Sequence, residues 1–176
     1  MAEVITKTPV TTYGSTYIML HWFVALLVLA QLVFGGQMTA AFNAMMTGRI
    51  AAPGTGPGLG DAFVHGLLGS IIGLLMLGRL YLRLTHPIPP PAPGWAGTVS
   101  RINHWLFYIL LVGMPIAGLA TWFGGLERVG DVHALASQVL IALIALHIIG
   151  ALYHHVVQKD RTILRRMAPR RADPRA

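Results

Sequence analysis

Two histidines lie inside a mostly apolar stretch, DVHALASQVLIALIALHIIGALYHH, which covers residues 131–155. They are His133 and His147, fourteen residues apart. On an α-helix this spacing returns both side chains to similar faces, about 40° apart, and separates them by roughly 21 Å along the axis. A single metal ion needs its ligands within a few ångströms of one another. The spacing therefore predicts two separate ligand sites along one helix.

Four apolar runs are long enough to hold such sites inside a bilayer. The 176-residue chain is 55% hydrophobic and 11% charged, and this charged fraction is about half that of a typical soluble domain. A helix needs about 20 residues to cross a bilayer, and the runs of that length cover residues 16–37, 61–84, 103–123 and 131–157. We therefore expect an all-α membrane protein, with four transmembrane helices in an up-down-up-down bundle and a single domain over residues 1–176.

The segments between these runs differ in character. The second connector, THPIPPPAPGWAGTVSR, is rich in proline and should be an extended segment. The third, GGLERVG, leaves room only for a short turn. The chain has no cysteine, which excludes iron–sulfur clusters and covalently attached c-type haem.

Lysine and arginine gather on one side of the four spans. The opposite side carries only Arg49 and Arg128. The side of the two termini carries the other eleven, which are Lys7, Arg79, Arg83, Arg101, Lys159, Arg161, Arg165, Arg166, Arg170, Arg171 and Arg175. The positive-inside rule then places both termini in the cytoplasm. The basic tail over residues 158–176 is interpreted as a topology signal that contacts anionic lipids, and its position against a membrane argues against nucleic-acid binding.

With this orientation, each histidine of the last span has a partner at its own depth. His21 lies near the cytoplasmic start of the first span, and His65 lies near the outer start of the second. The last span runs inward, so His133 is the outer histidine and His147 the inner one. The depths therefore pair His65 with His133 near the outer face and His21 with His147 near the cytoplasmic face.

Two b haems fit these pairs, with the four histidines as axial ligands of the iron. A large apolar ring suits the interior of a bundle. Two imidazoles per iron leave no open coordination position, which favours electron transfer over oxygen binding. Small residues one or two turns after the histidines give a ring room to approach the backbone, or alternatively permit close helix packing; they are Gly69, Gly73, Ser137, Gly150 and Ala151.

Four further residues leave alternatives open. His104 lies at the depth of His21 and is the rival ligand for His147. His154 and His155 end the last run, and Arg79 lies near the cytoplasmic end of the second. All four are candidates by position for a quinone site, where protons must be exchanged. The alternative for each terminal histidine is an ordinary polar residue at the membrane interface.

Four segments of the sequence carry a resemblance to a known family. They are LHWFVALL, VHGLLGSIIGLLMLGRLYLRLTHPIPPP, NHWLFYILLVGMPIAGL and HALASQVLIALIALHIIGALYHHVVQKDRTILRRM. Together they resemble the bacterial cytochrome b561 family. The resemblance implies a four-helix inner-membrane protein whose two b haems are held by histidines of the first, second and fourth spans. In this chain those positions are His21, His65, His133 and His147.

The resemblance also implies a function. Some members are similar to a superoxide oxidase, which takes electrons from periplasmic superoxide and passes them through both haems to ubiquinone. We therefore expect a transmembrane electron carrier between a periplasmic-side donor, superoxide or another reductant, and membrane quinone. The short GGLERVG connector departs from the family pattern. The alternatives are a haem-bearing membrane anchor for a larger dehydrogenase or hydrogenase, and a transporter or metal-binding protein without haem.

Overall fold

The structure, a computed structural model, describes residues 12–35, 47, 59–90, 93–160 and 162–167. Within these ranges the regular elements are all helices: α1 (Ser15–Gly35), α3 (Leu59–Thr85), α4 (Gly94–Gly124), α5 (Glu127–Val156) and α6 (Thr162–Arg166). The first four are long and apolar enough to cross a membrane. The predicted all-α membrane fold with four transmembrane helices is confirmed. Lys7, Arg49, Arg161 and the tail from residue 168 onward lie outside the described residues.

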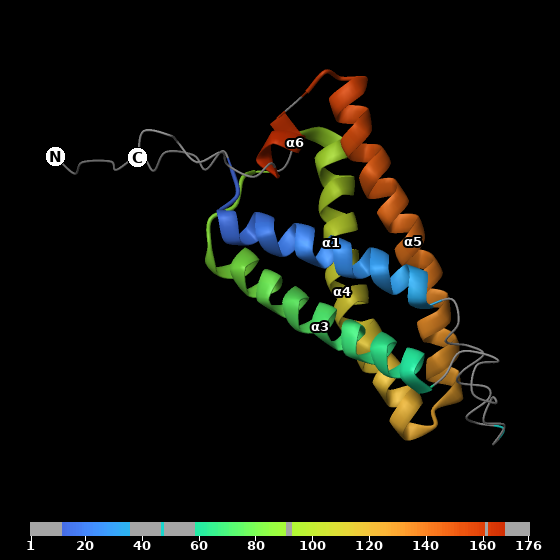
Figure 1. Ribbon diagram of the computed structural model, residues 1–176. Coiled ribbons are helices and arrows are strands. Elements are labelled where there is room, and N and C mark those ends of the chain that lie inside the picture. The colour runs from blue at the N-terminus through green and yellow to red at the C-terminus, as the bar shows by residue number, and fades with distance from the viewer. Residues whose placement is uncertain (1–11, 36–46, 48–58, 91–92, 161, 168–176) are drawn as a thin grey trace.

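Successive helices pack against one another, α1 on α3, α3 on α4 and α4 on α5. Figure 1 shows two antiparallel pairs, with α1 and α3 lying obliquely across α4 and α5. The start of α1, the end of α3, the start of α4 and the end of α5 all point to the same end of the bundle, as an up-down-up-down arrangement requires. Within the described residues, the backbones of α1 and α5 approach each other at most at isolated points.

The third transmembrane helix begins earlier than predicted. The sequence placed residues 94–102 in an extended connector, but α4 starts at Gly94. Pro93 is its N-cap, with extended φ and ψ of −67° and 157°. Proline disfavours helix only at its own position and the one before it, and no further proline occurs until Pro115. The extended part of the connector therefore ends at Pro93, and the helix continues through Pro115.

A two-residue turn joins α4 to α5. Gly125 has a left-handed φ of +64°, and its N–H donates to the Thr121 carbonyl at 3.0 Å. This is the usual way for glycine to end a helix. An added Cβ at Gly130 would lie 3.0 Å from Thr121 Cγ2. The last turn of α4 and the first turn of α5 are therefore in close contact. The short turn predicted for GGLERVG is confirmed, and part of that segment is itself helical.

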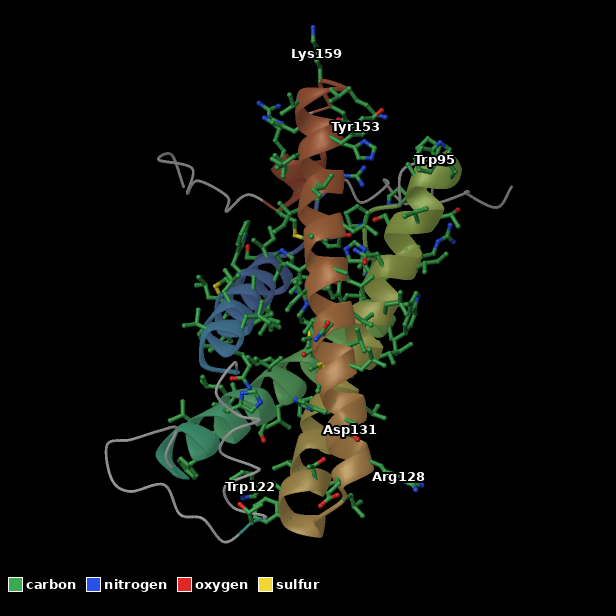
Figure 2. All side chains as sticks on the ribbon, turned by 90° about the vertical axis from the view of Figure 1, so that its right-hand side faces the viewer. Trp95, Trp122, Arg128, Asp131, Tyr153 and Lys159 are labelled. Carbon is green, nitrogen blue, oxygen red and sulfur yellow. The ribbon has the colours of Figure 1, made fainter. Side chains whose placement is uncertain are left out.

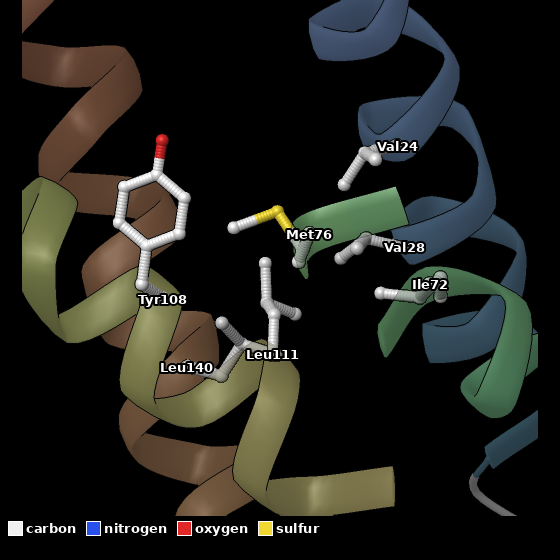
Figure 3. Packing of buried hydrophobic residues seen from close by; sticks show 7 residues of the cluster. All are labelled: Val24, Val28, Ile72, Met76, Tyr108, Leu111 and Leu140. Atoms are coloured by element: carbon white, nitrogen blue, oxygen red, sulfur yellow. The ribbon is translucent and has the colours of Figure 1, made fainter. Parts of the chain in front are cut away.

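A small apolar core lies where the two helix pairs cross (Figure 3). Its buried members come from all four long helices: Val24, Val28, Ile72, Met76, Tyr108, Leu111 and Leu140. Most other large apolar side chains are exposed. In a bilayer, lipid covers such side chains, so a spanning protein needs only a small internal core.

The short helix α6 returns to the end of the bundle that holds the start of α1 and the end of α3. Trp22 Nε1 donates to the Met167 carbonyl and an Arg166 guanidinium N–H donates to the Pro90 carbonyl, each at 2.9 Å. Asp160 accepts a hydrogen bond from the Thr162 backbone N–H at 2.9 Å. Hydrogen bonding from Thr162 holds the pKa of Asp160 below its usual range, so this contact stays intact at neutral pH and weakens only as the pH falls through that lowered value.

Gly73 marks the closest approach of α3 to α4. An added Cβ there would lie 3.3 Å from Pro115 Cγ and 3.8 Å from the Leu111 carbonyl oxygen. An added Cβ at Gly69 would lie 3.3 Å from Gln31 Nε2 of α1. Both glycines therefore face protein side chains. Of the two interpretations of these glycines, the contacts favour close helix packing over space for a ring. Gly150 differs, because nothing lies within 4 Å of its added Cβ.

Gly73→Ala is expected to lower the thermal unfolding midpoint of the detergent-solubilised protein. The rigid Pro115 ring cannot rotate away from the new methyl group, and overpacking of this kind costs about 1–3 kcal/mol. Gly78→Ala on the same helix is the matched control, since nothing lies within 4 Å of its Cβ position. The control should keep or slightly raise the midpoint. Equal midpoints for the two variants would show that the α3–α4 contact is loose.

Candidate functional site

The structure brings His65 of α3 and His133 of α5 together. Their ring centroids are 6.1 Å apart, and the ring planes meet at 68°. His133 Nδ1 lies 2.9 Å from the Met114 carbonyl oxygen of α4. A carbonyl only accepts, so Nδ1 carries the proton and donates. That tautomer leaves Nε2 of His133 with a free lone pair, as a metal ligand requires.

A glycine of a neighbouring helix lies against each of these two imidazoles. An added Cβ at Gly118 of α4 would lie 3.3 Å from His133 Cε1 and 3.5 Å from its Nδ1. An added Cβ at Gly35 of α1 would lie 3.5 Å from His65 Cε1 and 3.7 Å from its Nδ1. Each imidazole therefore turns its Cε1–Nδ1 edge toward the glycine of a neighbouring helix. Neither glycine was singled out from the sequence, because nothing in the spacing indicates which helix faces the ring.

Gln31 ties α1 to α3 beside the outer pair. Its Nε2 donates to the His65 carbonyl at 2.7 Å, a contact that the absent side chain of Gly69 allows. A polar side chain inside a span is costly unless it is hydrogen-bonded. This bond fixes the α3 backbone at the position from which the His65 imidazole projects. The sequence offered a signal here, since Gln31 is a polar residue within an apolar run.

The structure also brings His21 of α1 and His147 of α5 together. Their ring centroids are 6.2 Å apart and their planes meet at 55°. His104 of α4 is a third imidazole at this place, with its centroid 5.3 Å from that of His147. His104 Nδ1 donates to the Ser100 carbonyl at 2.6 Å, within its own helix. His147 is therefore the member of this group that both other imidazoles approach.

The ring separations fit a metal held between two imidazoles. An imidazole nitrogen lies about 2 Å from a bound first-row metal, so two rings on opposite sides of one metal have centroids about 6 Å apart. The His65–His133 and His21–His147 separations of 6.1 and 6.2 Å match that value. The His104–His147 separation of 5.3 Å is shorter. Within the part of the chain that the structure describes, no group of three or more side chains forms a site for a bare metal ion.

The apolar core separates the two histidine groups. Leu140 belongs to this core and lies on α5 seven residues from both His133 and His147. Val24 and Val28 follow His21 by one and two turns on α1. The core therefore lies between the two sites along the bundle, and it excludes water from the space between them.

The remaining candidates all lie toward the end of the bundle that holds the start of α1 and the end of α5. Arg79 is 6% exposed, and its guanidinium carbon lies 4.8 Å above the centre of the Tyr17 ring. His154 and His155 are half-buried, and the Nδ1 atom of each is buried without a hydrogen-bond partner. Figure 2 shows Tyr153 beside them at one end of the molecule and Trp122, Arg128 and Asp131 at the other.

A tyrosine pair was missed by the sequence reasoning. The hydroxyl groups of Tyr17 in α1 and Tyr108 in α4 lie 3.2 Å apart and are hydrogen-bonded. Both side chains are buried. Each residue is one turn from a histidine of the inner group, Tyr17 from His21 and Tyr108 from His104. The sequence gives no sign of this contact, because it depends on how α1 and α4 are rotated.

Comparison with known proteins places this geometry in a family. The sequence pattern of the prokaryotic cytochrome b561 family matches residues 12–170. Cytochrome b562 of Cereibacter sphaeroides is 31% identical, over 90% of this chain and 96% of that protein. The probable superoxide oxidase CybB of Yersinia pestis is 28% identical, and cytochrome b561 homolog 1 of Escherichia coli is 27% identical. These two alignments cover 90% of this chain and 97% and 98% of the relatives.

Proposed function

The chain belongs to the prokaryotic cytochrome b561 family, and on that premise we propose that it moves electrons between a periplasmic-side donor and membrane quinone through two b haems. The family and the four spanning helices make it a multi-pass haem protein of the bacterial inner membrane that transfers electrons. The observation that carries the two-haem proposal is the matching ring separation of two histidine pairs, 6.1 and 6.2 Å.

Four histidines are proposed as the axial ligands. His65 and His133 hold the outer haem, and His21 and His147 hold the inner one. When bound, haem iron supplies reversible one-electron chemistry. The protein's part would be to supply two imidazoles to each haem, to orient the ligands by contacts with neighbouring helices, and to keep water out of the space between the sites. For His133, the hydrogen bond to the Met114 carbonyl orients the imidazole and fixes its tautomer.

The quinone site is proposed at the cytoplasmic end. Reduction of a quinone consumes protons, so groups that exchange protons must lie near it. His154 and His155 present buried, unpartnered Nδ1 atoms there, and His104 and Arg79 lie at the inner histidine group. The lipid bilayer surrounds all four spans, and it supplies quinone laterally to such a site.

Superoxide is proposed as the donor. The support is the relative named as a probable superoxide oxidase, which aligns over 90% of this chain. Two superoxide anions would give up one electron each and leave as two O₂. The two electrons and two protons would convert one quinone to quinol. Arg128 is an exposed cation beside the α4–α5 turn, and a cation at the outer surface steers small anions toward it.

A combined measurement tests this function. The haem-to-protein ratio and the reduced-minus-oxidised spectrum of the purified chain should give two low-spin b haems per chain. Superoxide generated outside proteoliposomes should then reduce quinone in their membranes. Haem reduction by superoxide without quinone reduction would contradict the quinone end. Two haems that only a co-purifying dehydrogenase can reduce would favour the anchor-subunit alternative.

Gly118→Ala is expected to weaken binding of the outer haem by about tenfold, the usual cost of disturbing a group that positions a ligand. The new Cβ would lie 3.3 Å from His133 Cε1, closer than ordinary contact. Gly35→Ala is the matched control, with its Cβ at an ordinary 3.5 Å from His65 Cε1. The measurement is the outer-haem content after mild detergent washing. Similar loss in both variants would show that neither glycine edge positions the ring.

A further inference from the structure

A permanently charged side chain is buried within the protein without a counter-ion among the described residues. Arg79 belongs to a membrane-spanning segment and is only 6% exposed. Its Nε atom is buried and has no hydrogen-bond partner, and it forms no ion pair with any residue that the structure describes. Arginine stays protonated in proteins. A charge so placed is strongly unfavourable unless an anion neutralises it.

Among the described residues, the partner found for this charge is an aromatic ring. The Arg79 guanidinium carbon is 4.8 Å from the centre of the Tyr17 ring. Such a contact is weak beside the cost of desolvating a full charge. The acidic side chains that the structure describes are elsewhere. Glu127 and Asp131 are on the first turns of α5, at the end of the molecule opposite Tyr153, and Asp160 is occupied by Thr162.

The unpaired charge lies next to the inner histidine pair. Tyr17, on which Arg79 stacks, precedes His21 by one helical turn. Tyr17 is also hydrogen-bonded to Tyr108, which lies one turn from His104 of the same histidine group. Arg83, one turn further along α3, is half-buried and stacks over the rings of Trp105 at 5.5 Å and Tyr108 at 5.9 Å. Arg79 is thus the inward-facing cation of the inner site.

We propose that Arg79 binds a carboxylate of the inner haem. Haem b carries two propionate side chains, each ionised at neutral pH, and a guanidinium forms strong charge-assisted hydrogen bonds with carboxylates. This inference rests on the proposed placement of a haem between His21 and His147. A haem carboxylate is favoured over a phospholipid phosphate because the Arg79 side chain is only 6% exposed, so protein side chains cover it from lipid headgroups.

The test measures how fast the holoprotein loses its inner haem to an excess of apomyoglobin. The inner haem is identified as the phase that is absent in His147→Ala. Arg79→Gln should lose it about tenfold faster or more, the effect expected for one charge-assisted hydrogen bond. Arg79→Lys should fall between, since it keeps the charge but not the planar fork. Arg83→Gln, the matched control, should behave like the wild type.

A second experiment loads the wild-type chain and Arg79→Gln with either haem b or haem b dimethyl ester. The ester lacks both free carboxylates. The ester should leave the inner site about tenfold faster or more, and Arg79→Gln should then add nothing further. An unchanged rate for Arg79→Gln would overturn the proposal. An equal acceleration with both haem forms would also overturn it, and would assign the anion to quinone or phospholipid. Fewer than two haems per chain would instead overturn the proposed function.

Discussion

His147→Ala is expected to reduce the haem content from two per chain to one. His147 contacts both His21 and His104, so it is the imidazole that neither of the other two can replace. The remaining haem should be the outer one, held by His65 and His133. The measurement is the haem-to-protein ratio together with the reduced-minus-oxidised spectrum of the purified variant.

The same assay separates the two rivals for the second inner position. His21→Ala should also remove the inner haem, because its ring separation from His147 is 6.2 Å and matches a bridging metal. His104→Ala should retain it. His155→Ala is the control on α5, since no ring contact joins it to the inner group within the described structure. Retention of both haems in His147→Ala would show that α5 does not supply the inner ligand.

His133→Ala is expected to abolish superoxide-driven quinone reduction while leaving the inner haem in place. Removal of an axial ligand should lower the rate by more than roughly a hundredfold, because loss of a supporting partner alone costs about 10–100-fold. The inner haem should still be reducible by added quinol from the cytoplasmic side. Stopped-flow spectra with superoxide on one side and quinol on the other would measure both events separately.

The quinol arm is the internal control of that experiment. A variant that had merely misfolded would fail with both reductants. Continued superoxide-driven reduction in His133→Ala, with one haem per chain, would contradict an outer entry point for electrons. It would instead place the donor site at the cytoplasmic end.

The depth pairing of the histidines could be predicted because each helix crosses the membrane once. Depth is then fixed by position in the sequence, and His65 must lie near the level of His133 whatever the packing. The choice between His21 and His104 was not open to the same reasoning. Both lie at the level of His147, and their contacts depend on the rotation of α1 and α4 about their own axes.

That rotation depends on close contacts that the sequence does not reveal. Helices α3 and α4 lie close together where Gly73 faces Pro115, and nothing in the sequence pattern pairs these two residues. For Gly73 the sequence left two interpretations open, room for a ring or close helix packing. The start of α4 was predicted too late because the whole proline-rich connector was expected to be extended, including the residues after its last proline. The turns after Pro93 show that a helix can begin directly after the last proline.

The side of the bundle between α1 and α5 has no continuous packed interface among the described residues. Each proposed haem draws one ligand from α5 and one from the α1–α3 pair, so the cofactors would join the two helical hairpins across that open side. Binding that occurs only in the folded state adds to its stability. In haem-starved cells the newly made chain would lack this connection, and its two hairpins would be held together only through the α3–α4 contact. Membrane proteases would then degrade it more readily. Its abundance would then follow the haem supply without any dedicated regulator.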